Sequence, residues 1–173
     1  MTIFNGEYLV QADPIKEMWK HRRKTTGPGG TSFGLGEAGY DIRIKQEVRF
    51  MPSEMGMRVF LVHDQKEIAE RRRGRFALAS TIEEFQMPNF LTGIVHDKST
   101  WARRGLSVFN TVIEPGWHGF LTLELVYHGE DELIIPAGAG IAQVMFHEVK
   151  QPANYNGKYQ NQADNPVSAI DSQ

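Results

Sequence analysis

Short β-forming segments separated by turn residues occupy most of the chain from Tyr40 onward, and this pattern constrains the fold more than any other feature. Gly, Pro, Asp and Asn residues separate the segments, which are residues 40–45, 59–62, 76–82, 91–95, 120–127, 133–135 and 141–146. Closely spaced short strands are typical of a β-barrel or β-sandwich. Because 173 residues can bury one sizeable core, we expect residues 1–150 to form a single all-β domain.

Two short helical segments and one loop are expected beside these strands. Asp13 precedes a proline and an amphipathic stretch, which predicts an N-terminal helix that Asp13 caps and the basic residues 20–24 end. Residues 25–36 are rich in Gly, Thr and Ser and are expected to form a loop. A second helical turn is expected over residues 99–104, with Ser99 as its cap.

The C-terminal segment 151–173 differs in composition from the rest of the chain. Asn, Gln, Gly, Asp and Ser dominate it, so it can bury little apolar surface and is predicted to be a mobile tail. It nevertheless contains Tyr155, Lys158 and Tyr159, which indicate that the tail orders over a bound molecule. A plain disordered end is the alternative.

The composition excludes several classes of function. The chain has no cysteine, which rules out disulfides, a thiol nucleophile and every cysteine-based zinc site. Its histidines lack metal-ligand spacing, so no zinc is expected. A net charge of −2 provides no general attraction to nucleic acid or to anionic membranes. No signal peptide is visible, and no apolar run approaches the about 20 residues that cross a bilayer. We therefore expect a cytoplasmic protein without a nucleic-acid or membrane partner.

Glu124 is the first candidate for a chemical role. It lies inside the apolar segment 120–127, where strand alternation places it on one face with Thr122 and places Leu123 and Leu125 on the other. A carboxylate in such a strand is disfavoured unless it is paired, hydrogen-bonded or functional. It is either a general acid/base or a solvent-facing glutamate at the barrel edge.

A second candidate is the polar run that contains Lys98, Ser99, Thr100 and Arg103. Cations, hydroxyl groups and backbone N–H groups at a helix start are what an oligophosphate requires. An ordinary surface turn with scattered charges is the alternative. Glu114, in a turn between two strands, is either a ligand for a sugar hydroxyl or a solvated turn carboxylate.

Five motifs in order resemble the dCTP deaminase branch of the dUTPase superfamily. They are AGYDIR (38–43), KSTWARRGL (98–106), IEPGWHG (113–119) running on into LTLEL (121–125), PAGAGIAQ (136–143) and YNGKYQNQ (155–162). The resemblance implies a distorted β-barrel or β-clip of the dUTPase type, with a short N-terminal helix. It also implies a homotrimer with shared active sites. The substrate would be a dCTP-like nucleotide with Mg²⁺ on its triphosphate, deaminated without a protein-bound metal.

The resemblance also assigns roles to individual residues. Glu124 matches the catalytic glutamate, which takes a proton from water and delivers protons to the pyrimidine and to ammonia. Ser99 and Arg103 match the residues that support the water, the glutamate and the phosphates. The remaining residues of the implied nucleotide site are Lys98, Thr100, Asn110, Thr111, Val112, Glu114, Trp117 and Gln143, together with Tyr155, Lys158 and Gln162 of a tail that closes over the nucleotide.

Two departures from the family pattern bear on the substrate. Glu114 stands where the family has the aspartate that contacts deoxyribose, and the hairpin at residues 107–112 is shorter than in the family. Because this hairpin lies against the pyrimidine in the family, a shorter one enlarges the base pocket. We therefore expect a 5-substituted dCTP, such as a methyl or hydroxymethyl form, as the natural substrate.

Three functions remain open from the sequence. The first is a dCTP deaminase that releases dUTP and ammonia. The second is a bifunctional, dUMP-forming deaminase or a dUTPase-like pyrophosphohydrolase, since Gln143 resembles the corresponding residue of those enzymes. The third is a non-catalytic, nucleotide-sensing protein with the same fold.

Overall fold

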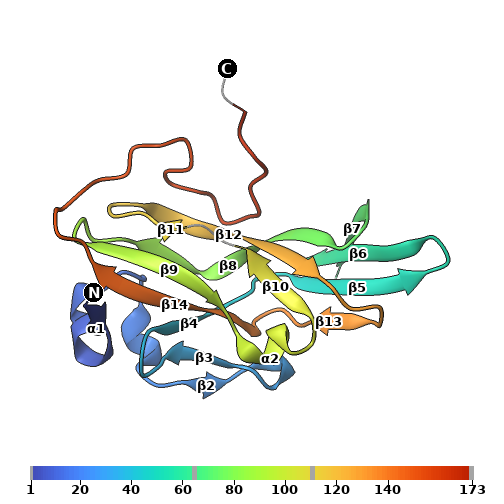
Figure 1. Ribbon diagram of the computed structural model, residues 1–173, viewed down its shortest axis with the longest axis horizontal. Coiled ribbons are helices and arrows are strands. Elements are labelled where there is room, and N and C mark those ends of the chain that lie inside the picture. The colour runs from blue at the N-terminus through green and yellow to red at the C-terminus, as the bar shows by residue number, and fades with distance from the viewer. Residues whose placement is uncertain (1, 64–65, 110–111, 172–173) are drawn as a thin grey trace.

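The computed structural model describes residues 2–63, 66–109 and 112–171 (Figure 1). Over these residues the strands form three antiparallel sheets of seven, three and four strands. The predicted all-β fold is confirmed. Within the described ranges the sheets remain open at their edges and do not close into a barrel.

The largest sheet has the spatial order β11-β9-β14-β4-β3-β2, and β1 also pairs with β14. Its strands are β1 (Ile3–Phe4), β2 (Thr25–Thr26), β3 (Ser32–Leu35), β4 (Tyr40–Arg43), β9 (Leu91–Asp97), β11 (Val112–Ile113) and β14 (Gly140–Glu148). β14 pairs with both β4 and β9, and its inward side chains are fully buried. The strands predicted at residues 40–45, 91–95 and 141–146 are confirmed.

A three-stranded sheet carries the residues of greatest functional interest. It has the order β10-β12-β8, with bounds β8 (Phe76–Gln86), β10 (Leu106–Phe109) and β12 (His118–Tyr127). Because β12 is the central strand, its C-terminal half has a cross-strand neighbour on each side. The strands predicted at residues 76–82 and 120–127 are confirmed.

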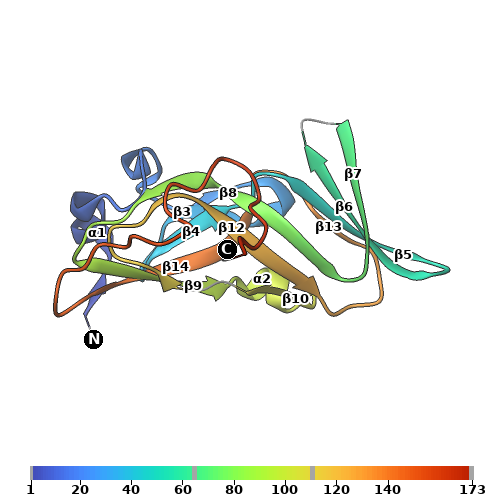
Figure 2. The ribbon, with the colours of Figure 1, turned by 90° about the horizontal axis from the view of Figure 1, so that it is seen from above.

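A four-stranded sheet extends away from the other two at one end of the molecule (Figures 1 and 2). Its order is β13-β5-β6-β7, with bounds β5 (Glu47–Ser53), β6 (Gly56–His63), β7 (Lys66–Arg73) and β13 (Leu133–Ile135). The rings of Phe50 and Tyr127 lie 5.2 Å apart and join this sheet to the end of β12. The predicted strands at residues 59–62 and 133–135 are confirmed.

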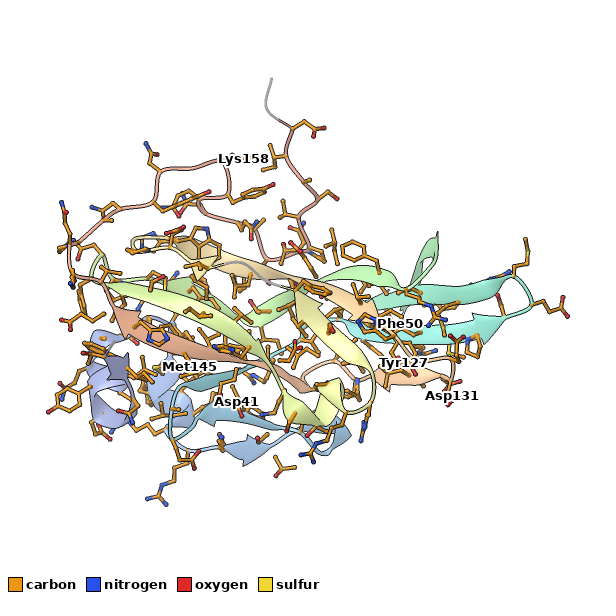
Figure 3. The ribbon with its side chains drawn as sticks, in the orientation of Figure 1. Asp41, Phe50, Tyr127, Asp131, Met145 and Lys158 are labelled. Atoms are coloured by element: carbon orange, nitrogen blue, oxygen red, sulfur yellow. The ribbon has the colours of Figure 1, made fainter. Side chains whose placement is uncertain are left out.

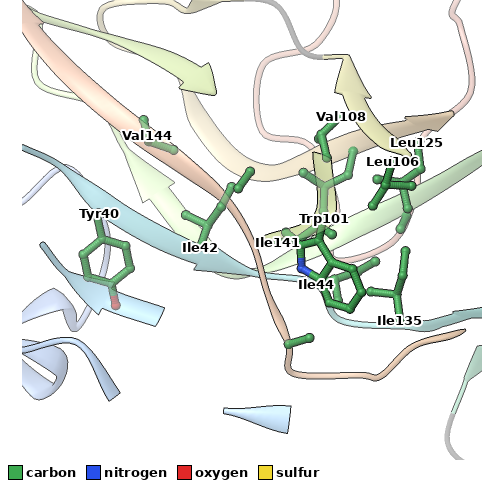
Figure 4. Packing of buried hydrophobic residues seen from close by; sticks show 14 of the residues in the cluster. Tyr40, Ile42, Ile44, Trp101, Leu106, Val108, Leu125, Ile135, Ile141 and Val144 are labelled. Carbon is green, nitrogen blue, oxygen red and sulfur yellow. The ribbon is translucent and has the colours of Figure 1, made fainter. Parts of the chain in front are cut away.

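A single-turn helix, α2 (Ser99–Ala102), is held in place by the hydrophobic core. Trp101 is 1% exposed and packs among aliphatic side chains (Figure 4). Its indole N–H donates to the carbonyl of Gly140 at 2.8 Å. The predicted helical turn is confirmed, but the prediction that Ser99 caps it is wrong. Lys98 is the N-cap residue, and no side chain caps the helix. An isolated helix this short is unstable in water, so core burial of Trp101 stabilises it.

The N-terminal helix was predicted at the wrong place. Helix α1 covers Gly6–Ala12, and Asp13 ends it in a left-handed conformation instead of capping a helix that follows. After Asp13 the chain pairs with β8 through an Ile15–Phe85 bridge, which requires extended backbone. A 3-10 helix, η1 (Met18–His21), is the only helical part of the predicted stretch within the described residues. No helix in the described ranges has the length and apolar character to span a bilayer.

The expected loop at residues 25–36 was also wrong. It contains β2, the 3-10 helix η2 (Pro28–Gly30) and β3. β3 pairs with β4, so tertiary contacts supply the hydrogen bonds that make the segment regular. Glycine and serine disfavour strands on local grounds, but an available sheet edge outweighs that preference.

A buried ion pair connects the largest sheet to the sheet that contains β12. The guanidinium Nε of Arg43 and its backbone N–H both donate to the Glu83 carboxylate at 2.8 Å. Burial raises the pKa of the Glu83 carboxyl, whereas the charge of Arg43 opposes that rise. β4 and β8 are therefore joined by a charge pair that would be costly to break.

Candidate active site

A cavity of about 830 Å³ lies between β12, β8 and the C-terminal tail, and we call it the β12 cavity. The tail crosses this face of the molecule in both ribbon views (Figures 1 and 2). The cavity is lined by Phe76, Leu78, Val112, Ile113, Glu114, Trp117, Leu121, Thr122, Glu124, Tyr155, Tyr159, Gln162, Val167, Ser168 and Ala169. Its walls are thus mainly apolar and aromatic, with two carboxylates, as in many small-molecule sites.

Glu124 projects into this cavity from the middle of β12. The predicted alternation is confirmed, because Leu123 and Leu125 are fully buried on the opposite face while Glu124 is exposed in the single chain. Among the described residues, no hydrogen bond or ion pair engages its carboxylate. The group is therefore available to a water molecule or a ligand, as a general base must be.

The turn between β11 and β12 contributes Glu114 and Trp117 to the cavity. Trp117 donates its backbone N–H to the Glu114 carbonyl at 3.1 Å, which closes the turn. Its indole is almost fully buried against Phe85, with ring centroids 6.2 Å apart. The indole N–H donates to the carbonyl of Tyr159 at 2.7 Å. Trp117, predicted to bind substrate, therefore lines the cavity and also anchors the tail.

The tail follows β12 through backbone contacts. Gln162 forms a parallel bridge with Gly119, and its carbonyl accepts the N–H of Phe120 at 3.2 Å. Farther along, Val167 donates its N–H to the Thr122 hydroxyl at 3.0 Å. These contacts bring Gln162, a predicted substrate-binding residue, to the wall of the cavity.

Two glycines, Gly116 in the β11–β12 turn and Gly119 at the start of β12, allow the tail to approach. Gly119 has φ +128°, and a Cβ there would lie 2.5 Å from the backbone nitrogen of Gln162. Gly116 has φ +74°, and a Cβ there would lie 3.0 Å from the Cα of Asn154. Both positions combine a backbone conformation that favours glycine with close contact to the tail. The turn is therefore shaped to receive this segment.

Tyr155 and Lys158, the other predicted tail residues, differ in position. Tyr155 lines the cavity and donates its backbone N–H to the Pro115 carbonyl at 2.8 Å. Lys158 does not line the cavity, and its ammonium donates to the carbonyl of Ile170. In this conformation Lys158 thus binds the end of the tail through Ile170 and does not contribute to the cavity wall.

The predicted phosphate-binding residues lie elsewhere. Lys98 donates its ammonium to the Asp41 carboxylate and, at 3.1 Å, to the Ser32 hydroxyl. Gln143 donates to the other Asp41 oxygen at 3.2 Å, and Lys24 lies 3.8 Å from the same carboxylate. Asp41 is 1% exposed, so two lysines and an amide converge on one buried charge.

Asp41 and Ser32 were missed as site residues by the sequence analysis. The sequence signal that could have identified Asp41 is a carboxylate between two apolar strand residues, Tyr40 and Ile42, both of which are buried in the structure. Figure 3 shows Lys158 in the tail at the top of the view and Asp41 in the lower half, inside the largest sheet. In a single chain, the Asp41 cluster is therefore separate from the tail that borders the β12 cavity.

Ser99, Thr100 and Arg103 also lie outside the β12 cavity. Ser99 and Arg103 are exposed at the two ends of α2. α2 leads through Gly105, whose carbonyl accepts the N–H of His128 just beyond the end of β12. The single chain thus does not combine Glu124 with the α2 residues. Val112 does line the cavity, whereas Asn110 and Thr111 lie outside the described residues.

In the part of the chain that the structure describes, no three His, Asp or Glu side chains gather in a way that could hold a metal ion. The cationic and hydroxyl side chains at α2 are better suited to bind phosphate oxygens than to bind a metal ion.

The chain is similar in sequence to proteins of a known family. Residues 10–149 match the sequence profile of the family described as dCTP deaminase-like. A dCTP deaminase from Protochlamydia amoebophila is 35% identical over 156 residues, covering 83% of each chain. One from Campylobacter concisus is 38% identical over 149 residues, covering 79% of this chain and 80% of the relative.

A solved structure shares the fold. It is the dUTPase of Staphylococcus bacteriophage 80alpha, with a TM-score of 0.50 and 17% identity over 83% of this chain and 94% of that one. The dUTPase-type fold expected from the sequence is thereby confirmed.

Proposed function

The chain belongs to the dCTP deaminase-like family, and from this we propose that it hydrolyses dCTP, or a 5-substituted dCTP, to the corresponding dUTP and ammonia. The observation that carries the proposal is the carboxylate of Glu124, which has no hydrogen-bond or ion-pair partner among the described residues and lies in a cavity walled by Trp117, Tyr155 and Gln162. Because the substrate is a nucleoside triphosphate, the proposal includes a cytoplasmic location.

Glu124 acts as general acid/base in this proposal. Its carboxylate accepts a proton from a water molecule while the water oxygen bonds to C4 of the cytosine ring. The proton passes to N3, and the second water proton goes to the amino group as the C4–N bond breaks and ammonia leaves. The net reaction is dCTP plus water giving dUTP plus ammonia, and Glu124 ends in its starting state.

The complete site combines residues of more than one subunit of a homotrimer. Glu124 lines the β12 cavity, whereas Ser99 and Arg103 are exposed on α2 and do not line it. A neighbouring copy that presents its α2 to the cavity would supply the missing polar groups. Ser99 then supports the attacking water, and Arg103 faces both Glu124 and the phosphates.

The triphosphate is held by the start of α2 and by the tail. Lys98, Ser99, Thr100 and Arg103 provide two cations and two hydroxyl groups. Mg²⁺ arrives on the phosphate oxygens and supplies charge neutralisation there. The tail, residues 151–173, closes over the nucleotide through Tyr155, Lys158 and Gln162, and Lys158 exchanges its contact with Ile170 for a phosphate oxygen.

The base pocket favours a 5-substituted cytosine. The resemblance places the segment 107–112, which includes Asn110, Thr111 and Val112, against the pyrimidine, and its shorter length supports a larger base pocket. Glu114 at the cavity wall reaches one methylene farther than aspartate toward the sugar, which shifts a positioned hydroxyl or water. Comparing turnover of dCTP with that of its 5-substituted forms tests this point, and a strong preference for plain dCTP would remove it.

A second candidate function is cleavage of the phosphate chain, giving dUMP and pyrophosphate. Gln143 supports it, because its amide shares the Asp41 carboxylate with Lys98 and so lies beside a proposed phosphate-binding residue. The deciding experiment incubates the protein with a panel of dNTPs and Mg²⁺ and identifies the products by chromatography. Ammonia without pyrophosphate supports the simple deaminase; binding without turnover indicates a non-catalytic nucleotide sensor.

Arg103→Ala is expected to lower kcat/KM for dCTP by about 10- to 100-fold, because a charged hydrogen bond contributes about 1.5–3 kcal/mol. Both KM and kcat should change, since the guanidinium faces the phosphates and Glu124 in the proposed site. Arg58→Ala, on the distant four-stranded sheet, is the control. Steady-state kinetics with size-exclusion chromatography checks the result, and an unchanged kcat/KM would exclude Arg103 from the site.

A further inference from the structure

The surroundings of Glu124 on the outer face of its sheet are apolar. In the strand register, Glu124 pairs with Phe109 on β10 and with Leu78 on β8, so all three side chains share one face. Two residues along β12 on the same face are Val126 and Thr122. Of these four nearest neighbours, only Thr122 is polar, and its hydroxyl already accepts the N–H of Val167.

Large apolar side chains remain exposed around this carboxylate. Phe109 is 54% exposed, and Phe76, which pairs with Val126 in the next row, is 42% exposed. Leu78 and Phe76 line the β12 cavity together with Glu124, whereas Phe109 lies beside Glu124 on the same strand face without lining the cavity. Exposed aromatic rings beside a functional carboxylate are well placed to meet a ligand. We call Phe76, Leu78 and Phe109 the apolar wall.

The chemistry of cytosine determines what this wall would contact. The carboxylate must reach the water and amino group at C4, and C5 is bonded directly to C4. A substituent at C5 therefore lies beside the reacting centre, and neighbouring strands place side chains about one strand spacing, 4.8 Å, to either side of Glu124. Side chains at that spacing on either side of Glu124 are Leu78 and Phe109.

We propose that the apolar wall selects cytosine nucleotides that carry a methyl group at C5, over both plain and 5-hydroxymethyl forms. The inference rests on the proposed function, because it requires Glu124 to act at C4. A methyl group gains contact with Leu78 and the aromatic rings as it leaves water. A hydroxymethyl group that points at the apolar wall would bring its hydroxyl against Leu78 and the phenylalanine rings, which offer no hydrogen bond, and this costs affinity. Both the methyl and the hydroxymethyl form fit an enlarged pocket, so the hydroxyl of the hydroxymethyl group is what makes that form bind less well.

The test measures ammonia release from dCTP, 5-methyl-dCTP and 5-hydroxymethyl-dCTP. We expect kcat/KM to be about 10-fold higher for the methyl form than for dCTP, since one methyl group in an apolar pocket discriminates by that order. The hydroxymethyl form should fall below the methyl form. Equal turnover of plain and methyl forms, or faster turnover of the hydroxymethyl form, would overturn the proposal.

Variants of the apolar wall test whether these residues cause the preference for the methyl form over plain dCTP. Leu78→Asn and Phe109→Asn are expected to bring the ratio of kcat/KM for methyl and plain dCTP close to one, whereas Ile134→Asn, an exposed apolar residue on β13, should leave it unchanged. The ratio is measured within one preparation and does not depend on the folded fraction; Leu78→Ala provides a milder change. A ratio that survives in all wall variants would overturn the proposal, whereas absence of ammonia from every nucleotide in the wild-type protein would refute the proposed function itself.

Discussion

Glu124→Gln is expected to lower kcat for ammonia release by about 10²- to 10⁴-fold, the usual contribution of a general acid/base. The amide keeps the size and shape of the side chain but cannot accept the proton of the attacking water. Because Glu124 is exposed in the single chain and has no partner among the described residues, the change should leave folding intact. Nucleotide affinity should also persist, so the loss appears in kcat more than in KM.

Ammonia release, measured by a coupled assay, checks the kinetics, and size-exclusion chromatography checks the assembly. Glu148→Gln is the matched control, because Glu148 is an exposed glutamate at the end of β14 that does not line the β12 cavity. If Glu124→Gln retained more than a small fraction of wild-type turnover, another group would have to be the base. Glu114, the other carboxylate of the cavity, would then be the first residue to test.

Gly119→Ala is expected to detach the tail and to lower kcat/KM by about 100-fold, the loss that follows when a positioning group moves by about 1 Å. The added Cβ would lie 2.5 Å from the nitrogen and 2.7 Å from the carbonyl oxygen of Gln162. Both are backbone atoms that cannot rotate away. The parallel bridge between Gly119 and Gln162 must therefore open, and Gln162 leaves the cavity wall.

Gly74→Ala separates this effect from simple backbone strain. Gly74 has φ +118°, close to the +128° of Gly119, but a Cβ there would meet nothing within 4 Å. The two variants therefore share a similar cost of backbone conformation, and only Gly119→Ala adds a collision with the tail. Hydrogen exchange of residues 159–163 and the KM for nucleotide provide two independent readouts. Equal effects of the two substitutions would show that tail docking contributes nothing to activity.

Local patterns were sufficient for the strands and for the face that Glu124 occupies. Successive side chains of a strand point to opposite faces whatever surrounds the strand, so Leu123 and Leu125 had to be buried if Glu124 was not. The family motifs likewise identified Gln162, Tyr155 and Glu114, which all reach the β12 cavity.

Segments whose structure depends on distant partners were predicted less well. The stretch after Asp13 has a helical pattern, yet it becomes extended because Ile15 pairs with Phe85. The glycine-rich residues 25–36 become partly β because β3 adds to the edge of β4. In each case hydrogen bonds to another strand outweigh a weak local preference.

The sequence by itself determined the all-β fold, the family and the strand face that Glu124 occupies, because these depend on strand periodicity and on short motifs. Only the tertiary structure decided which side chains surround the Glu124 carboxylate and which residue holds Lys98, the predicted phosphate-binding lysine. Phe109 and Leu78 meet Glu124 through strand register, and Lys98 reaches Asp41 across 57 positions of the chain. Such contacts arise from how strands pair in space, and local sequence patterns carry no record of that pairing.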